Sequence, residues 1–264
     1  MSAGRVDVCG AGIDPCTLEE AVRRIVDRAR AGGPPEYVVT PNAHHVVLLQ
    51  DSELFRRIYD AAWLSVADGM SVVWASRILG RPLPGKVSGI DLFQAVCGAA
   101  AGTGLRVFLL GGRPGAAAEA ARVMRAARPE LVIAGTYCPP MGFENDPAES
   151  ARALQAVRAA APHILFVALG APKQEIWMYE NRARLGVPVS AGVGAAFDFA
   201  AGFVRRAPRW MQRTGLEWVF RVLMEPGRLG RRYAVTNPRF VRIFLRHYLR
   251  NRRATRRESL PAAR

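Results

Sequence analysis

The sequence has no long apolar run and few cysteines, and each shortage excludes a class of protein. No apolar run approaches the ~18 to 20 residues that a transmembrane helix needs, and residues 1–7 lack the charged-then-apolar layout of a signal peptide. We therefore expect the protein to stay in the cytoplasm. The four cysteines form no C-x-x-C pair and lie in or beside apolar stretches, so we expect reduced thiols rather than disulfides or a zinc site.

Several metal-binding and nucleotide-binding motifs are also missing. There is no D-x-D or H-E-x-x-H motif, and the adjacent His44 and His45 would point in different directions on a helix, so a metal site is not favoured. Neither G-x-G-x-x-G nor G-x-x-x-x-G-K-[ST] occurs, which argues against a dehydrogenase-type dinucleotide fold and a P-loop kinase. The charge of any bound phosphate must then be neutralised by Arg, Lys and helix dipoles.

Acidic residues are scarce at the C-terminal end. Residues 1–203 hold 20 Lys and Arg against 19 Asp and Glu, whereas residues 204–264 hold 17 Arg against 3 Glu. Of the net charge of +15, +14 therefore lies in the last 61 residues. A neutral body with a basic end is typical of a protein whose end alone meets a polyanion, such as lipid headgroups, a pyrophosphate or a nucleic acid.

What the sequence does contain is one arrangement repeated from Glu36 onward: a short apolar run, a polar or glycine-bearing loop, and a helical pattern. This alternation is typical of βαβ units and predicts an α/β fold, a Rossmann-like parallel sheet flanked by helices, over residues 1–203. The predicted strands are residues 37–39, 64–66, 106–110, 131–135, 163–169 and 187–191.

The pattern changes after Gly202. Amphipathic helical patterns over residues 216–224 and 239–249 indicate a basic helical appendage over residues 204–250. The pattern fits equally a helix in a membrane interface and a face packed on the main domain. Residues 251–264 are polar and lack periodicity, and we expect a disordered tail there.

Polar clusters follow several of the predicted strands. Because ligands of open parallel sheets bind at the carboxyl ends of the strands, we expect these clusters to meet at one edge. The residues concerned are Thr40, Asn42, Asp68, Lys173, Gln174 and Asp198.

Asp68 is the candidate for chemistry. It lies between a predicted strand and a helix, before a glycine, and this position alone fits either a helix N-cap or a carboxylate that faces a ligand. The amide and cationic side chains expected at the same edge favour a general base.

Two other features suggest phosphate contacts. Gly111 and Gly112 begin a glycine-bearing loop whose N–H groups could face a phosphate at the following helix N-terminus, although the motif is weak. The only lysines, against 35 arginines, are Lys86 and Lys173, both in predicted loops near the same edge. Compact ammonium groups there indicate point-charge contacts with phosphate, with chance placement as the alternative.

Several motifs in a fixed order carry a resemblance to a known family. They are Thr40-Pro41-Asn42, Ala67-Asp68-Gly69, Val87-Ser88-Gly89-Ile90-Asp91, Phe108-Leu109-Leu110-Gly111-Gly112, Gly170-Ala171-Pro172-Lys173-Gln174-Glu175, Gly192-Val193-Gly194 and Arg206-Ala207-Pro208. From about Val8 to about Arg232 the chain resembles the WecG/TagA/CpsF family, glycosyltransferase family 26.

The resemblance implies an inverting, metal-independent hexosyltransferase without a cofactor, whose catalytic domain is residues 1–203. Its implied donor is a UDP-sugar carrying N-acetylmannosamine or a related hexosamine or uronic acid. Its implied acceptor is a polyprenyl-pyrophosphate-linked sugar such as GlcNAc-pyrophosphate-undecaprenol, in cell-surface polysaccharide or teichoic acid synthesis. It also implies peripheral association with the inner face of the cell membrane and leaves a homo-oligomer open.

The resemblance also implies roles for single residues. Asp68 matches the residue proposed as the base that deprotonates the acceptor hydroxyl. Lys86 stands where the family is expected to have an arginine that contacts pyrophosphate, which keeps the charge but loses bidentate geometry. The implied substrate-binding residues are Thr40 and Asn42 in the pocket, Gln174 and Asp198 near the nucleotide sugar, and Arg221, Arg228 and Arg231 at the pyrophosphate.

Two functions of other classes compete with this hypothesis. A nucleic-acid-binding protein would use the Arg-rich end on phosphate backbones, but it leaves the strand-end cluster without a purpose, and aromatic stacking motifs are absent. A nucleotide-dependent oxidoreductase would need the glycine fingerprint that the sequence lacks. We therefore expect a membrane surface, and no nucleic acid, as the partner of the basic end.

Overall fold

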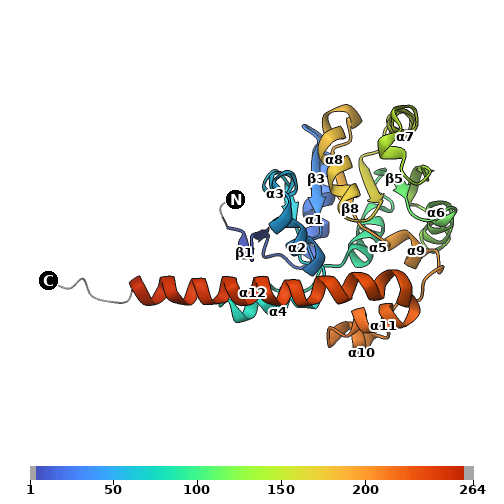
Figure 1. Cartoon of the computed structure of the whole chain (residues 1–264). Coiled ribbons are helices and arrows are strands. Elements are labelled where there is room, and N and C mark those ends of the chain that lie inside the picture. Colours follow the sequence, from blue (N-terminus) through green and yellow to red (C-terminus); the bar gives the residue numbers. More distant parts are fainter. Residues whose placement is uncertain (1–3, 259–264) are drawn as a thin grey trace.

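The computed structural model describes residues 4–258, except the side chains of Arg228 and of residues 253–258. A parallel sheet of six strands lies at its centre (Figure 1), in the order β4-β3-β8-β7-β5-β6. Every neighbouring pair in this sheet is parallel, as the sequence predicts. The strands are β3 (Glu36–Val39), β4 (Leu64–Ser65), β5 (Arg106–Gly111), β6 (Val132–Tyr137), β7 (Ile164–Ala168) and β8 (Val189–Gly192).

Helices cover both faces of the sheet, which explains why its strands are continuously apolar. Alternate residues of one strand enter different cores: Val107 and Leu109 of β5 belong to one buried cluster, and Phe108 and Leu110 to the other. The helices of the first cluster are α1 (Leu18–Ala31), α5 (Gly89–Ala100), α6 (Ala116–Ala127) and α9 (Ala196–Ala200). Those of the second are α2 (Ala43–Asp51), α3 (Glu53–Asp60), α4 (Met70–Ile78), α7 (Pro147–Ala160) and α8 (Lys173–Leu185).

A small antiparallel hairpin, β1 (Val6–Val8) and β2 (Ala11–Ile13), precedes the sheet. It is attached to the end of β4 by side chains. Arg5 forms an ion pair with Asp14 at 3.0 Å and donates to the carbonyl of Ala62 at 2.6 Å. Asp14 in turn accepts a hydrogen bond from the backbone N–H of Ser65 at 2.8 Å. The hairpin thereby supports the short edge strand that leads to Asp68.

The C-terminal part is helical, in agreement with the predicted appendage. It consists of α10 (Arg209–Arg213), α11 (Glu217–Met224), a short π-helical turn η2 (Pro226–Gly230) and α12 (Arg231–Glu258). Figure 1 shows these helices, together with α4, on one side of the molecule. Helix α12 continues past Arg250 to Glu258, through part of the stretch expected to be disordered, since arginine and alanine favour helix. The rest of that stretch, residues 259–264, lies outside the described residues.

One face of α12 packs on the main domain. Phe240 is buried, and Ile243 and Phe244 pack against the same core cluster as α2 and α3. Arg239 forms an ion pair with Asp51 of α2 at 2.8 Å. Of the two arrangements that the sequence leaves open for this helix, the packed face is therefore present in the structure.

The cysteines are reduced and mostly buried. All four cysteines are free thiols, and Cys9, Cys16 and Cys97 are buried. Burial raises the pKa of the Cys9 thiol to about 12 and of the Cys16 thiol to about 11. Within residues 4–258, no helix has the length and apolar character needed to span a membrane.

Candidate active site

Asp68 lies just past the carboxyl end of β4, at the predicted edge of the sheet. Its backbone N–H donates to the carbonyl of Pro41 at 2.8 Å, which joins the loop after β4 to the loop after β3. Helix α4 has Gly69 as its N-cap and no side-chain cap hydrogen bond, so Asp68 does not serve as the cap of this helix in the described structure. Its half-buried carboxylate is left for another role.

The surroundings of Asp68 make it a weak acid that can act as a base. Burial is the main cause that raises its pKa to about 6. Lys86 opposes the shift most strongly, and Glu217 adds to it. Arg221 also favours the ionised carboxylate. A carboxylate with this pKa is ionised at pH 7 and can still accept a proton from a hydroxyl group in a transition state.

Lys86 is held next to the loop of Asp68. The backbone N–H of Val87 donates to the carbonyl of Ala67 at 2.7 Å, which pairs the two loops directly. The Nζ atom of Lys86 donates to Oε2 of Glu217, the first residue of α11, at 2.8 Å. Both side chains are largely buried, with 13% and 23% of their surfaces exposed. The appendage therefore contributes directly to the surroundings of Asp68.

A buried polar network connects three of the strand-end loops. Nδ1 of His45 accepts from the backbone N–H of Asn42 at 3.3 Å, so the ring proton is on Nε2, which donates to Glu175 at 3.2 Å. Gln174 donates to the same Glu175 oxygen at 2.7 Å. Oε1 of Gln174 accepts from the backbone N–H of Gly194 at 3.0 Å. The loops after β3, β7 and β8 are thus fixed relative to one another.

Thr40 and Asn42, both expected in the substrate pocket, also stabilise the loop after β3. Thr40 is buried, and its hydroxyl donates to the carbonyl of Gly192 at 3.1 Å. Asn42 is the N-cap of α2 and accepts from the backbone N–H groups of His44 and His45 at 3.0 and 3.4 Å. They lie at the predicted edge, and their contacts with a substrate stay a prediction.

Gly111 and Gly112 are required by the backbone at the end of β5. Both have positive φ angles, +98° and +84°, which favour glycine. A Cβ atom at Gly111 would lie 2.7 Å from the carbonyl oxygen of Ala168, so no side chain fits there. The N–H of Gly112 donates to this same carbonyl at 2.8 Å. The expected phosphate contact of this loop stays a prediction, and the N–H of Gly112 already has a partner.

Asp198 of α9 contacts Arg113 in the loop after β5. Its Oδ1 accepts from the backbone N–H of Arg113 at 3.3 Å, and its Oδ2 lies 3.6 Å from Nε of Arg113. The guanidinium group of Arg113 donates to Glu225, just after α11, at 2.7 Å. The loop after β5 is therefore linked to the C-terminal end of α11. The role of Asp198 near a nucleotide sugar stays a prediction.

The two lysines do not lie together. Lys173, the first residue of α8, is half-exposed and forms an ion pair with Glu144 of η1 (Phe143–Asn145), which follows β6. Strands β3 and β8 separate β7 from β4, so Lys173 and Asp68 follow strands that are not neighbours. Lys86 is the lysine that acts on Asp68. A phosphate contact of Lys173 would require it to leave Glu144.

The three expected appendage arginines have different surroundings. Arg221 lies one turn after Glu217 on α11, with its guanidinium 5.5 Å from the ring centre of Phe199 and near enough to Asp68 to influence its pKa. Arg231 begins α12 and is exposed. Arg228 lies in η2, and its side chain is outside the described residues. The assignment of all three to pyrophosphate binding stays a prediction.

Among the side chains that the structure describes, no three His, Cys, Asp or Glu residues are grouped so that they could hold a metal ion. Cations near Asp68 come instead from Lys86 and Arg221.

Three residues at the site are not singled out by the sequence motifs: His45, Arg113 and Glu217. Glu217 carried a signal, because it is one of 3 acidic residues in a segment with 17 arginines. Arg113 directly follows the Gly111-Gly112 pair at a strand end. His45 lies three residues after the helix cap Asn42, a position that indicates a capping contact but not its buried bond to Glu175.

A carboxylate with a raised pKa beside cations, at the carboxyl edge of a Rossmann-like sheet, suits the chemistry of a sugar-nucleotide transferase. The model of the WecG/TagA/CpsF glycosyl transferase family matches residues 6–254, and this chain belongs to that family. It is similar to N-acetylglucosaminyldiphosphoundecaprenol N-acetyl-beta-D-mannosaminyltransferase of Bacillus spizizenii, with 31% identity over 211 residues that cover 80% of this chain and 79% of the relative. The motif-based resemblance and the glycosyltransferase class are confirmed, and the nucleic-acid alternative finds no support.

Proposed function

We propose that this glycosyltransferase moves N-acetylmannosamine, or a related hexosamine or uronic acid, from a UDP-sugar to a polyprenyl-pyrophosphate-linked acceptor such as GlcNAc-pyrophosphate-undecaprenol. The observation that carries the proposal is Asp68, an ionisable carboxylate beside Lys86 and Arg221 in a chain of this family. The Bacillus spizizenii relative is named for a GlcNAc-diphosphoundecaprenol acceptor and a mannosaminyl group.

The proposed reaction is a direct displacement at C1 of the donor sugar. The acceptor hydroxyl attacks C1 from the face opposite UDP, which inverts the configuration, while Asp68 takes the hydroxyl proton. The C1–O bond breaks and its electron pair leaves with the diphosphate of UDP. One base is sufficient for this step, because the departing diphosphate is a weakly basic anion that needs a cation more than a proton.

Cations close to Asp68 would stabilise that departing anion. Lys86 is fixed by the loop pairing between Val87 and Ala67, and Arg221 approaches from α11. Charge-assisted hydrogen bonds to an anion that develops in the transition state lower the barrier more than they tighten substrate binding. We therefore assign the leaving diphosphate to the cations Lys86 and Arg221.

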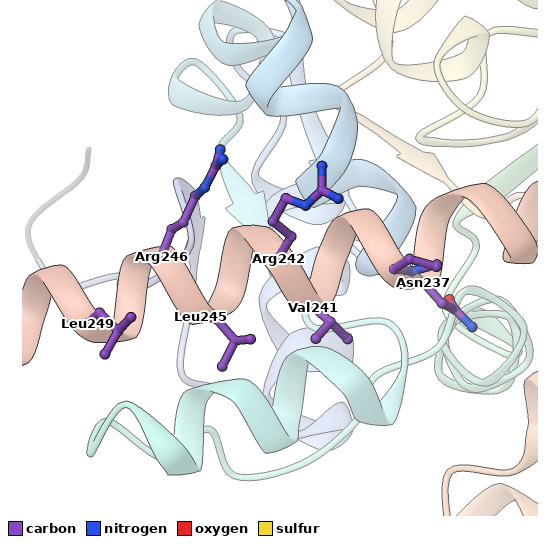
Figure 2. A pocket seen from close by; sticks show the side chains of 7 residues that line it. Asn237, Val241, Arg242, Leu245, Arg246 and Leu249 are labelled. Carbon is purple, nitrogen blue, oxygen red and sulfur yellow. The ribbon is translucent and has the colours of Figure 1, made fainter.

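We further infer that the protein associates peripherally with the inner face of the cell membrane through α12. Figure 2 shows Val241, Leu245 and Leu249 in a row on one side of this helix, with Arg242 and Arg246 on the other. The three apolar side chains are about half exposed. They line a shallow groove of about 620 Å³ with the neighbouring residues Asn237, Pro238, Arg242 and Arg246. An exposed apolar row flanked by arginines suits an interface with anionic lipid.

Three helices that carry exposed tryptophans support a membrane contact on the side of α12. Trp74 of α4, Trp210 of α10 and Trp218 of α11 are all exposed. Figure 1 shows their three helices on the side of the molecule along which α12 runs. Tryptophan favours the boundary between lipid headgroups and acyl chains. A lipid-linked acceptor would then reach Asp68 from the membrane.

The proposal is tested by supplying a panel of UDP-sugars together with a lipid-pyrophosphate-GlcNAc analogue and measuring UDP release. We expect acceptor-dependent UDP release with UDP-N-acetylmannosamine or a related sugar. The rate in buffer to which no metal is added should not change when EDTA is present. Absence of acceptor-dependent release with every UDP-sugar would contradict the proposed substrates. Loss of release in EDTA, restored by a divalent cation, would contradict the proposed metal independence.

A further inference from the structure

Glu217 is an acidic residue placed among basic ones at the proposed active site. It is one of 3 glutamates in a segment with 17 arginines, and it begins the helix of the appendage that approaches Asp68. A carboxylate near Asp68 disfavours the ionised base, which makes its position costly unless it serves another purpose. Its partners indicate what that purpose is.

Two cations surround the Glu217 carboxylate: Lys86 of the main domain and Arg206 of the segment that follows it. Lys86 donates to one oxygen at 2.8 Å, and Nε of Arg206 lies 3.7 Å from the other. Arg206 is itself fixed, because its terminal nitrogens donate to Asp91 of α5 at 2.5 and 2.8 Å. Two positioned cations that share one anion form a site that would also suit a phosphate.

The donor diphosphate and Glu217 therefore require the same ammonium group. Asp68 must lie beside the acceptor hydroxyl on one face of C1, and the diphosphate leaves from the opposite face, where the long side chain of Lys86 would reach it. We propose that Glu217 occupies the place of the donor diphosphate in the ligand-free protein and leaves Lys86 when a UDP-sugar binds. This inference rests on the proposed function, because it takes the donor to be a nucleoside diphosphate sugar.

The other end of α11 shows how the first turn could move while the helix stays attached. Glu225, just after the helix, is paired with Arg113, which Asp198 also holds. Eight residues of helix separate the two glutamates by about 12 Å, so the two pairs are distinct sites. When Glu217 leaves, Arg221, one helical turn later, would lie next to the bound diphosphate. A basic group would then stand there in place of an acidic one.

The test measures the affinity of UDP by isothermal titration calorimetry for the full chain and its variants. Glu217→Gln removes the competing charge and keeps the shape, so we expect it to bind UDP about tenfold more tightly. Glu19→Gln, exposed on α1, is the matched control for the change of charge and should leave the affinity unchanged. In a Lys86→Met background, Glu217→Gln should tighten binding less, since only Arg206 is still contested.

A second measurement follows the helix itself. Trp218 is adjacent to Glu217, and its ring centre lies 5.8 Å from that of Tyr233. Addition of UDP should change the tryptophan fluorescence of the wild type, and Trp218→Phe should remove that change. An unchanged melting temperature of each variant establishes that it is folded.

The outcomes separate this inference from the function on which it rests. If the wild type binds UDP and Glu217→Gln binds it equally or more weakly, the inference is wrong and the donor proposal stands. If Glu19→Gln tightens binding as much as Glu217→Gln, the change in net charge is the cause and the inference is also wrong. If the wild type does not bind UDP at all, both proposals fail.

Discussion

The Nζ atom of Lys86 lies 2.8 Å from Oε2 of Glu217, a residue 131 positions later in the chain. This ion pair joins the loop beside Asp68 to the first turn of α11, so the surroundings of the proposed base include residues of the basic appendage. The appendage is therefore part of the site in this structure as well as a candidate membrane anchor. Both functions of the segment can be tested separately.

The pH dependence of the rate reports the protonation of Asp68. A base must be deprotonated to act, so kcat/KM should rise with pH through about 6 and level off above it. Because Glu217 raises the pKa of Asp68, Glu217→Gln should move this acidic limb to lower pH, and Lys86→Met should move it to higher pH. The measurement is kcat/KM between about pH 5 and 8, the range around this pKa. An acidic limb that neither variant moves would show that another group titrates.

Arg221 should matter most for the natural form of the acceptor. Arg221→Ala removes a cation near Asp68, and we expect the rate to fall about tenfold or more with a lipid-linked acceptor and less with a soluble analogue. Arg213→Ala, which removes an exposed arginine of α10, is the control and should have little effect on either acceptor. Equal losses of Arg221→Ala on both acceptors would show that this arginine acts on the donor diphosphate alone.

The apolar row on α12 should carry membrane binding. Leu245→Glu places a charge in the middle of this row, and we expect it to reduce binding to vesicles that contain anionic lipid, measured by co-sedimentation. Val132→Glu introduces the same charge at an exposed apolar position on the edge strand β6 and should bind vesicles like the wild type. If both variants bind equally well, α12 is not the membrane contact.

The sheet and the position of the site could be predicted because local patterns determine them. Apolar runs of strand length followed by polar loops gave the six strands, and parallel strands necessarily place loops such as Ala67-Asp68-Gly69 and Thr40-Pro41-Asn42 at one edge. The hairpin β1–β2 has strands of only three residues, too short for a periodic pattern, and Arg5 and Asp14 attach it through contacts that no local signal indicates.

The choice of partners at the site could not be predicted, since it depends on packing between distant segments. Both lysines are predicted to lie in loops at the same edge, yet Lys86 forms an ion pair with Glu217 and Lys173 forms one with Glu144. The length of α12 could not be predicted from the sequence pattern either. Phe240 and its neighbours hold this helix by packing on α2 and α3. Three-dimensional contacts thus decide which lysine lies near Asp68.

The central claim is that Asp68 is the base of the transfer reaction. The most direct measurement compares Asp68→Asn with the wild type in acceptor-dependent UDP release and in UDP binding by calorimetry. We expect turnover to fall by about 100-fold to 10,000-fold, the typical contribution of a general base, while the affinity for UDP is retained. Turnover close to that of the wild type in a folded Asp68→Asn variant would contradict the account.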